Sequence, residues 1–200
     1  MSTSAESESP DADASERDLT ETSVSSESVF DGALLHAYRD TVRLPDGRTA
    51  TREWIDHPGA VAVVPIFENG DTMLIRQFRF PPRRAFLEVP AGKFDHDDEP
   101  PEAVGTRELK EETGLSAERM TAVGSFFPCI GYSNEVIHVY VAESLTQGAQ
   151  ELTDDEFVEP VRLPFAEAVT RAKSGSLGDM KTITALTRAH YALQQRGAKI

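Results

Sequence analysis

One stretch of the chain, residues 91–115, restricts the fold more than any other because helix boundary signals enclose an unusual density of acids. Its sequence is AGKFDHDDEPPEAVGTRELKEETGL. Asp98 is a good N-cap candidate, Pro100 suits a first helical turn, and Gly114 can adopt the left-handed conformation that ends a helix. The stretch therefore predicts a helix over residues 100–113.

Three glutamates share one face of this predicted helix. At about 100° per residue, Glu108, Glu111 and Glu112 fall within an arc of roughly 100°, while Leu109 points toward a core. Like charges at this spacing destabilise an isolated helix by roughly 0.2–0.5 kcal/mol per pair, so the stripe is unfavourable until a cation binds. Clustered carboxylates suit Mg²⁺ or Mn²⁺ bound together with substrate phosphates. Arg107, four residues before Glu111, can orient a carboxylate by a charge-assisted hydrogen bond, and we place it in the catalytic group.

The same stretch resembles the Nudix box, in which a glycine and a glutamate precede the pattern Arg-Glu-aliphatic-x-Glu-Glu-x-Gly-aliphatic. The matching residues are Gly92, Glu99, Arg107, Glu108, Leu109, Glu111, Glu112, Gly114 and Leu115. This chain has one residue more than is usual between the first glycine and the first glutamate, so either Glu99 or Asp98 fills the glutamate position. The plain alternative, a solvated acidic helix face, does not require nine matching positions.

The resemblance implies metal-dependent hydrolysis of a P–O–P linkage. Glu108 and Glu112 are then expected to bind the metal together with the backbone carbonyl of Ala91, and Glu111 either shares a metal or polarises the attacking water. A further carboxylate, Glu135, lies in the segment GYSNE, which we expect to be a flexible loop. Such a loop can close over bound substrate, so Glu135 is either the general base or a closing ligand; the alternative is a surface glutamate.

Other segments resemble the branch of the Nudix superfamily that hydrolyses ADP-ribose and nucleoside diphosphate sugars. These segments are REWIDHPGAVAVVPI, LIRQFR, LEVPAGK, GYSNE and GDMKTITAL. The resemblance implies a homodimer in which Arg52 and Glu53 reach the partner's nucleotide. Arg79 would lie against the base or the phosphates, and Lys93 could meet the diphosphate. An ordinary exposed strand arginine is the alternative for Arg79.

The fold class expected is α/β, a Nudix-type α/β/α sandwich around a mixed sheet with an N-terminal β-hairpin region. Alternating apolar residues and turn sequences such as Asn69-Gly70-Asp71 predict the strands, and two helices are expected to close the chain. Gly105 in the middle of the acidic helix costs about 1 kcal/mol relative to alanine, which indicates close approach of another element. The expected organisation is a disordered acidic tail (1–27), dimer-forming N-terminal strands (28–57) and a Nudix hydrolase domain (58–200).

Composition excludes several classes of partner. The formal net charge is −14, and residues 1–28 hold eight acids and one base, which is half of that charge. An acidic surface repels nucleic acid and anionic membranes, and no apolar run approaches the roughly 20 residues that a membrane span needs. The single Cys129 cannot form an internal disulfide, as is usual in a reducing cytosol. We expect a cytoplasmic protein with neither nucleic acid nor membrane as partner.

The substrate is less constrained than the chemistry. Ile130 stands where the ADP-ribose group usually has a proline, so other nucleoside diphosphate sugars stay open. A Nudix hydrolase acting on a deoxynucleoside triphosphate or a dinucleoside polyphosphate is one alternative. A non-catalytic ligand sensor is another, although such sensors commonly lose the metal carboxylates, which this chain retains at Glu108, Glu111 and Glu112.

Overall fold

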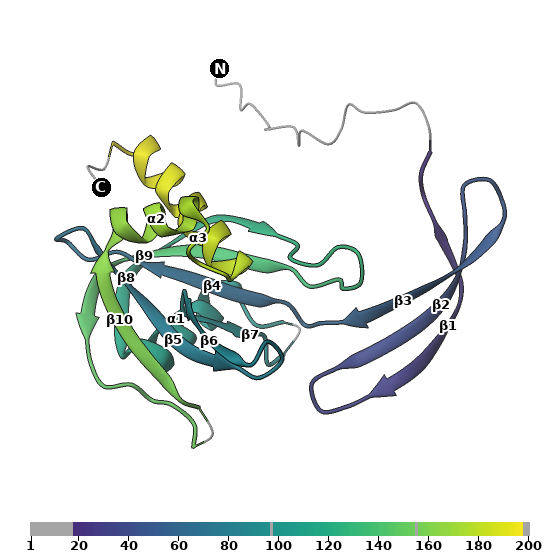
Figure 1. The fold of residues 1–200 in the computed structure, drawn as a ribbon, viewed down its shortest axis with the longest axis horizontal. Helices are drawn as coiled ribbons and strands as arrows, with labels where there is room; N and C mark the ends of the chain where they lie inside the picture. The colour runs from purple at the N-terminus through teal and green to yellow at the C-terminus, as the bar shows by residue number, and fades with distance from the viewer. Residues whose placement is uncertain (1–17, 97, 155, 198–200) are drawn as a thin grey trace. The chain divides into compact units, whose positions relative to one another are not determined.

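The computed structural model describes residues 18–96, 98–154 and 156–197 of the chain (Figure 1). The fold divides into two compact units, one ending at Ile55 and the other beginning at Asp56. Each unit has its own sheets, so the two are described separately. Residues 1–17, the larger part of the expected acidic tail, lie outside the described residues.

The first unit is a three-stranded sheet in the order β1-β2-β3, formed by β1 (Thr22–Asp31), β2 (His36–Arg43) and β3 (Thr49–Asp56). The expectation of disorder up to residue 27 is wrong for residues 22–27, which pair with β2 in antiparallel register. The backbone ladder holds this serine-rich strand, and the Ser26 hydroxyl adds a 2.6 Å hydrogen bond to Asp40. A polar segment with few apolar groups forms a strand here because β2 satisfies its backbone hydrogen bonds.

The second unit contains two sheets. The first sheet has the order β7-β4-β9-β8, with β4 and β9 parallel and the other pairs antiparallel, and the second has the order β10-β5-β6. The strands of both sheets are β4 (Ala60–Pro65), β5 (Asp71–Arg79), β6 (Arg84–Glu88), β7 (Ala91–Lys93), β8 (Leu115–Phe126), β9 (Ile137–Gln147) and β10 (Val158–Pro164). The three helices are α1 (Pro101–Thr113), α2 (Phe165–Ser174) and α3 (Met180–Gln195).

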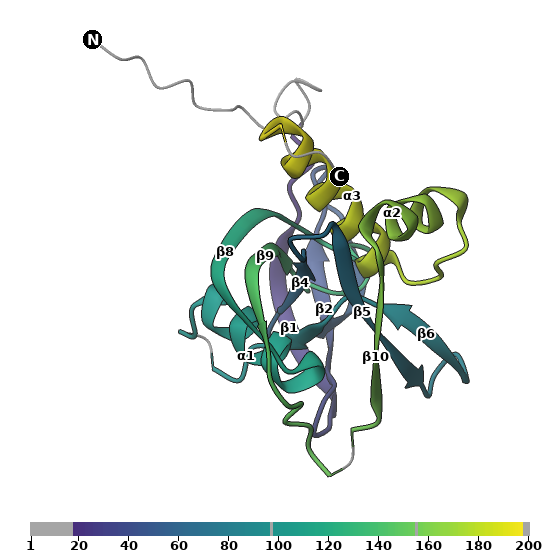
Figure 2. The same ribbon diagram turned by 90° about the vertical axis from the view of Figure 1, so that its left-hand side faces the viewer.

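Strand β4 shows why the helices form two layers. All six of its residues are buried, and successive side chains of a strand point to opposite faces. Val61 and Val63 pack in a cluster with Val104 and Leu109 of α1, whereas the alternating residues between them join a cluster with α2 and α3. Figure 2 shows the sheets between α1 and the pair α2 and α3. The predicted α/β/α sandwich around a mixed sheet is confirmed.

Helix α1 is the acidic helix predicted from the sequence, but its N-cap differs. Pro100 is the N-cap, with extended backbone and no side-chain cap hydrogen bond, so the prediction of Asp98 as the cap is wrong. The Pro100 carbonyl instead accepts hydrogen bonds from the N–H groups of Ala103 and Val104. The helix ends as predicted, because Gly114 has φ +73° and its N–H donates to the Lys110 carbonyl.

Gly105 brings α1 into contact with β4. A Cβ atom added to Gly105 would lie 3.0 Å from a methyl of Val61 and 3.1 Å from a methyl of Val63, tighter than ordinary van der Waals contact. The predicted close approach of another element is therefore confirmed, and the element is β4. Strand β8 follows Gly114 directly and begins at Leu115. Of the helices described, not one combines the length and the apolar character that a membrane crossing requires.

Candidate active site

Glu112 brings a buried carboxylate, and Glu108 a half-buried one, to the backbone of β7. Glu112 is only 6% exposed, and its Oε2 accepts a 2.9 Å hydrogen bond from the Ala91 N–H. The Glu108 carboxyl group packs against Gly92 so closely that a Cβ on Gly92 would lie 1.9 Å from the carboxyl carbon. A side chain at position 92 would therefore displace the Glu108 carboxyl group from this place.

Both carboxylates are poorly stabilised as anions. Burial raises the pKa of Glu112 to about 8, a rise that the Ala91 N–H opposes and the charge of Glu108 increases. Burial likewise raises the pKa of Glu108 to about 7, with Arg107 opposing and Glu111 adding to the rise. Two acids this close to each other and to the core prefer protons near neutral pH, so an added cation would favour their charged forms.

Arg107 orients the helix side of the site. Its Nη1 lies 2.7 Å from Glu108 Oε1 and 3.6 Å from Glu111 Oε2. The predicted contact between Arg107 and Glu111 is therefore present, although the shorter contact is with Glu108. Glu111 is more exposed than Glu108 and lies toward solvent on the same stripe.

Arg107 also holds the loop that precedes α1. Its Nη2 donates to the Lys93 carbonyl at 3.3 Å and lies 3.2 Å from Asp95 and 3.6 Å from Glu99. Glu99 is half-buried and accepts a hydrogen bond from the Asp95 N–H, whereas Asp98 is exposed. Of the two acids, it is Glu99 that contacts the box arginine. The Lys93 side chain is exposed.

The residues present fit a divalent cation whose remaining ligands are water molecules and substrate phosphates. Within the described residues, no three His, Cys, Asp or Glu side chains form a ready metal cage. Mg²⁺ does not need one, since it commonly uses one or two carboxylates, several waters and substrate phosphates. The Glu108 and Glu112 carboxylates supply hard oxygen donors, and the Ala91 N–H is engaged by Glu112 while its carbonyl remains the predicted third ligand.

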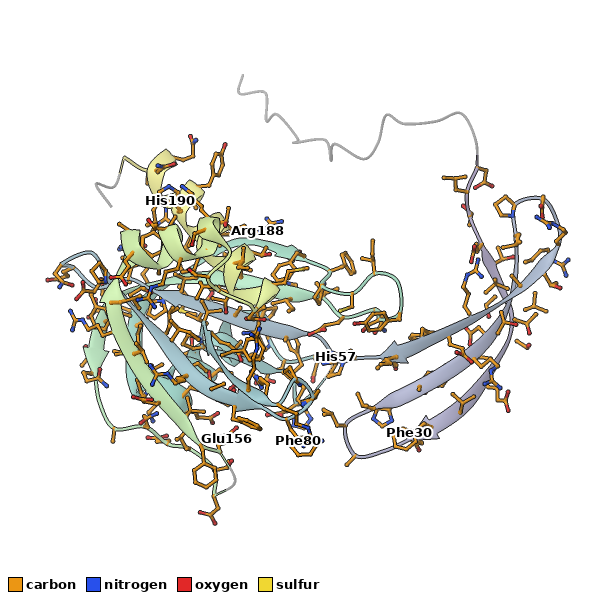
Figure 3. All side chains as sticks on the ribbon, viewed as in Figure 1. Phe30, His57, Phe80, Glu156, Arg188 and His190 are labelled. Atoms are coloured by element: carbon orange, nitrogen blue, oxygen red, sulfur yellow. The ribbon has the colours of Figure 1, made fainter. Side chains whose placement is uncertain are left out.

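Glu135 lies on the loop between β8 and β9, beside His57. Its Oε1 is 3.9 Å from His57 Nε2, and the Gly59 N–H donates to His57 Nδ1 (His57 is labelled in Figure 3). The Asn134 side chain fixes the loop by accepting from the His57 N–H at 2.8 Å and donating to Asp56 at 2.6 Å. No described hydrogen bond or ion pair joins Glu135 to the box carboxylates, so its role as general base stays a prediction.

Charged residues from β5, β6 and the start of α3 line a cavity of about 390 Å³. The lining residues are Arg79, Pro81, Pro82, Phe86, Glu88, Gly178, Asp179 and Lys181. Phe80, labelled in Figure 3, lies in the turn that joins β5 to β6. Arg79, predicted to bind substrate, is therefore on a cavity wall.

Three charged residues of this wall were missed from the sequence: Glu88, Asp179 and Lys181. Glu88 is 2% exposed and accepts hydrogen bonds from Arg79 Nε and Nη2 at 2.8 and 2.7 Å. Lys181 Nζ reaches the same carboxylate at 3.1 Å. One sequence signal was available: Glu88 lies between Leu87 and Val89 in an apolar strand. A carboxylate buried in such a strand needs charged partners, which predicts a cation near Glu88.

Two family models match adjacent segments of this chain. The NUDIX domain matches residues 56–185, and the nucleoside diphosphate sugar hydrolase N-terminal domain matches residues 21–55. The first match includes α1 and both box carboxylates. The chain belongs to the Nudix family. The two matched segments meet where the structure divides into two units.

Curated relatives and a solved structure agree with this Nudix assignment. The chain is 37% identical over 172 residues to an ADP-ribose pyrophosphatase of Bacillus subtilis (strain 168), covering 85% of this chain and 92% of that one. It is 36% identical over 132 residues to a GDP-mannose pyrophosphatase of Yersinia enterocolitica, covering 60% and 67%. A crystal structure of an ADP compounds hydrolase superposes with a TM-score of 0.78 at 21% identity, covering 90% and 98%, which confirms the Nudix fold.

Arg52 and Glu53 lie in the N-terminal unit, outside the NUDIX match. The Arg52 guanidinium pairs with Glu21 across the sheet, and Glu53 accepts from Arg39 Nε and Nη2 at 3.1 and 3.0 Å. Both are exposed ion pairs in this single chain. Their contact with a partner's nucleotide stays a prediction.

Proposed function

We propose that this Nudix hydrolase cleaves the diphosphate linkage of ADP-ribose to AMP and ribose 5-phosphate, or that of a related nucleoside diphosphate sugar. The observation that carries the proposal is the placement of Glu112, buried, and Glu108, half-buried, against the backbone of β7, where burial raises the pKa of both. A metal-binding role explains why a folded protein retains two such acids, since removing a carboxylate from water without sufficient counter-charge costs stability.

Residues of this chain would bind the metal ion, orient its ligands and accept the proton of the attacking water. We infer that Glu108, Glu112 and the Ala91 carbonyl hold Mg²⁺, or Mn²⁺ in its place. When bound, such an ion neutralises phosphate charge and lowers the pKa of a bound water. Arg107 keeps Glu108 oriented through its 2.7 Å contact. Glu135 is the proposed general base, with Glu111 as the alternative.

Substrate recognition is assigned to the cavity and the loops around it. Arg79 directs N–H donors along the cavity wall, where a diphosphate would accept them. Lys93 is exposed beside the loop held by Arg107 and is a second candidate for phosphate. Ile130 is 83% exposed on the loop that carries Glu135. Its place on this loop keeps substrates other than ADP-ribose open.

We further infer that the enzyme is a cytoplasmic homodimer with no nucleic acid or membrane partner. The N-terminal unit exposes apolar side chains that a second copy would cover, namely Val24, Val29, Phe30, Leu34 and Leu35. An exposed apolar face of this kind is typical of an interface. Light scattering of the intact chain tests the dimer, and a Phe30→Ser variant is expected to weaken it.

The activity is tested with a panel of ADP-ribose, ADP-glucose, GDP-mannose, diadenosine polyphosphates and deoxynucleoside triphosphates. Each compound is incubated with Mg²⁺ or with chelator, and the products are separated by chromatography. Metal-dependent release of AMP and ribose 5-phosphate from ADP-ribose is the expected result. Tight ADP-ribose binding with no cleavage of any compound would overturn the proposal in favour of a ligand sensor.

A further inference from the structure

Glu88 is the most buried acid of the charged cavity wall, and both cations that it contacts line the cavity. Its partners come from two segments far apart in sequence, Arg79 on β5 and Lys181 at the start of α3. Removing this carboxylate from water costs several kcal/mol unless hydrogen bonds compensate, and three donors do so here. The arrangement therefore fixes both cations at the cavity wall.

The way Glu88 binds Arg79 leaves part of the guanidinium free. Both Glu88 oxygens are used on the edge formed by Nε and Nη2, which is the bidentate geometry that fixes a guanidinium plane. Among the described residues no hydrogen bond engages Arg79 Nη1, and the Arg79 side chain is 41% exposed. A fixed guanidinium with free N–H donors and a solvent-facing edge is suited to bind a phosphate oxygen.

The start of α3 fixes the second cation. Asp179 caps the helix by accepting from the Thr182 N–H at 2.9 Å, and it lies 3.2 Å from Lys181 Nζ. The Thr182 hydroxyl oxygen accepts from the Val89 N–H at 2.9 Å, which fixes the helix start against the end of β6. Lys181 is thus held between two carboxylates, with its charge next to the Glu88 to Ala91 backbone.

The cavity wall also acts on the metal carboxylates. The charges of Lys181 and Arg79 both lower the pKa of Glu112, after the larger effects of burial, the Ala91 N–H and Glu108. The two cations therefore lie near enough to Glu112 for their charges to act on it. Without Glu88 and Asp179, the two cations would lose the contacts that orient them.

We propose that Glu88 is a positioning residue that holds Arg79 and Lys181 in place to bind one phosphate of the substrate in this cavity. The proposal deepens the proposed function and rests on it for the identity of the substrate. Binding of a diphosphate by the two oriented cations can be measured without turnover.

The test uses the full chain, its Glu88→Gln variant and inorganic pyrophosphate as the probe in titration calorimetry. Glutamine keeps the size of Glu88 but removes the charge that orients both cations. We expect pyrophosphate affinity to fall about tenfold, the effect of losing one charge-assisted contact of about 1.4 kcal/mol. The matched control is Glu159→Gln, which breaks a 3.0 Å ion pair with Arg76 elsewhere on the same sheet and should leave the affinity unchanged.

A double-variant comparison separates positioning from a general loss of structure. In an Arg79→Ala background, Glu88→Gln should weaken pyrophosphate binding by less than about threefold, because one of the two cations through which Glu88 acts is already absent. If Glu88→Gln does not fold, Arg79→Lys gives the second test, since lysine keeps the charge but cannot present a fixed planar edge; it should weaken binding about tenfold.

Substrate kinetics provide the readout that a purely structural role would not change. Once a hydrolysed substrate is known, Glu88→Gln should raise KM about tenfold while kcat changes less than threefold. Unchanged pyrophosphate affinity, or the same loss in the Arg79→Ala background as in the parent, would overturn the proposal. Absence of hydrolysis by the parent would overturn the proposed function alone, because pyrophosphate binding is measured without turnover.

Discussion

Glu88 and Glu112 are both buried acids of the same unit, yet their surroundings have opposite effects on them. Burial works to raise the pKa of each. At Glu88, hydrogen bonds from Arg79 and the charge of Lys181 outweigh burial, so the pKa is below its ordinary value. At Glu112, one backbone N–H and more distant cations do not, and the pKa rises to about 8.

The counter-charges of Glu88 are side chains of the protein itself, whereas we propose that the counter-charge of Glu112 is a bound metal ion. Glu88 has its counter-charges built into β5 and α3, so its function is to orient them. Of Glu108 and Glu112, only Glu108 contacts Arg107, and that arginine also binds the loop before α1. The second pair is therefore incomplete until a metal ion binds, which is the basis of the proposed hydrolysis.

The largest expected effect comes from replacing Glu112 by glutamine. Activity should fall by at least about 1,000-fold, since a metal ion supplies several kcal/mol of transition-state stabilisation. The fold should be retained, because the amide oxygen can still accept from the Ala91 N–H and a like charge next to Glu108 is removed. Steady-state turnover and a thermal melt measure the two effects, and a variant as active as the parent would contradict the assignment.

A smaller loss is expected for Glu135→Gln. If Glu135 is the general base, kcat should fall about 100-fold, while KM changes little, because the residue acts on the reacting water. Glu118→Gln, an exposed acid on β8, is the matched control. Equal losses in kcat and in ligand affinity would assign Glu135 to binding instead.

Metal affinity should depend on pH in the range where Glu108 and Glu112 titrate. Metal binding must displace their protons, so the apparent Mg²⁺ affinity should rise about tenfold per pH unit below pH 7 for each proton displaced, and level off above about pH 8. Titration calorimetry between pH 6 and 9 measures this slope. A flat profile would mean that the two carboxylates are not the ligands.

The smallest expected effect is on stability, where the two kinds of acid should act with opposite signs. Glu108 and Glu112 have raised pKa values, so the metal-free fold binds more protons than the unfolded chain and loses stability as pH rises through about 7 to 8. Glu88 has a lowered pKa, so its contribution is lost as pH falls below its ordinary range.

Thermal melts with chelator measure these opposing trends. The Tm should fall by several degrees between pH 6 and pH 8, and Glu112→Gln should reduce that fall. Saturating Mg²⁺ should restore the Tm at pH 8 by binding the folded state. An increase of the metal-free Tm over the same range would contradict the raised pKa values of Glu108 and Glu112.

The sequence predicted what depends on local spacing. The period of α1 placed Glu108 and Glu112 on one face, and Gly114 marked the end of the helix because φ +73° favours glycine. Gly105 indicated a close neighbour, although only the folded chain identifies it as β4. These features follow from helix geometry and backbone conformation, which a sequence encodes within a few residues.

Features that depend on distant partners could not be predicted. Glu88 and Lys181 are 93 residues apart, so no local pattern indicates that they pair. Strand β1 begins in a polar segment whose composition favours disorder, and only pairing with β2 makes it a strand. The N-cap at Pro100 was not predicted either, because Pro100 has no side-chain acceptor and caps the helix through its backbone carbonyl.

The contrast between the two acid sites is tested most directly by Mn²⁺ binding, measured by titration calorimetry at pH 8 with the parent, Glu112→Gln and Glu88→Gln. Because Glu112 is a proposed ligand and Glu88 is already paired with Arg79 and Lys181, only Glu112→Gln should abolish or strongly weaken binding. Glu88→Gln should bind Mn²⁺ within about threefold of the parent, less than the tenfold change that 1.4 kcal/mol produces. Parent-like binding by Glu112→Gln, or an equal loss in both variants, would contradict the distinction.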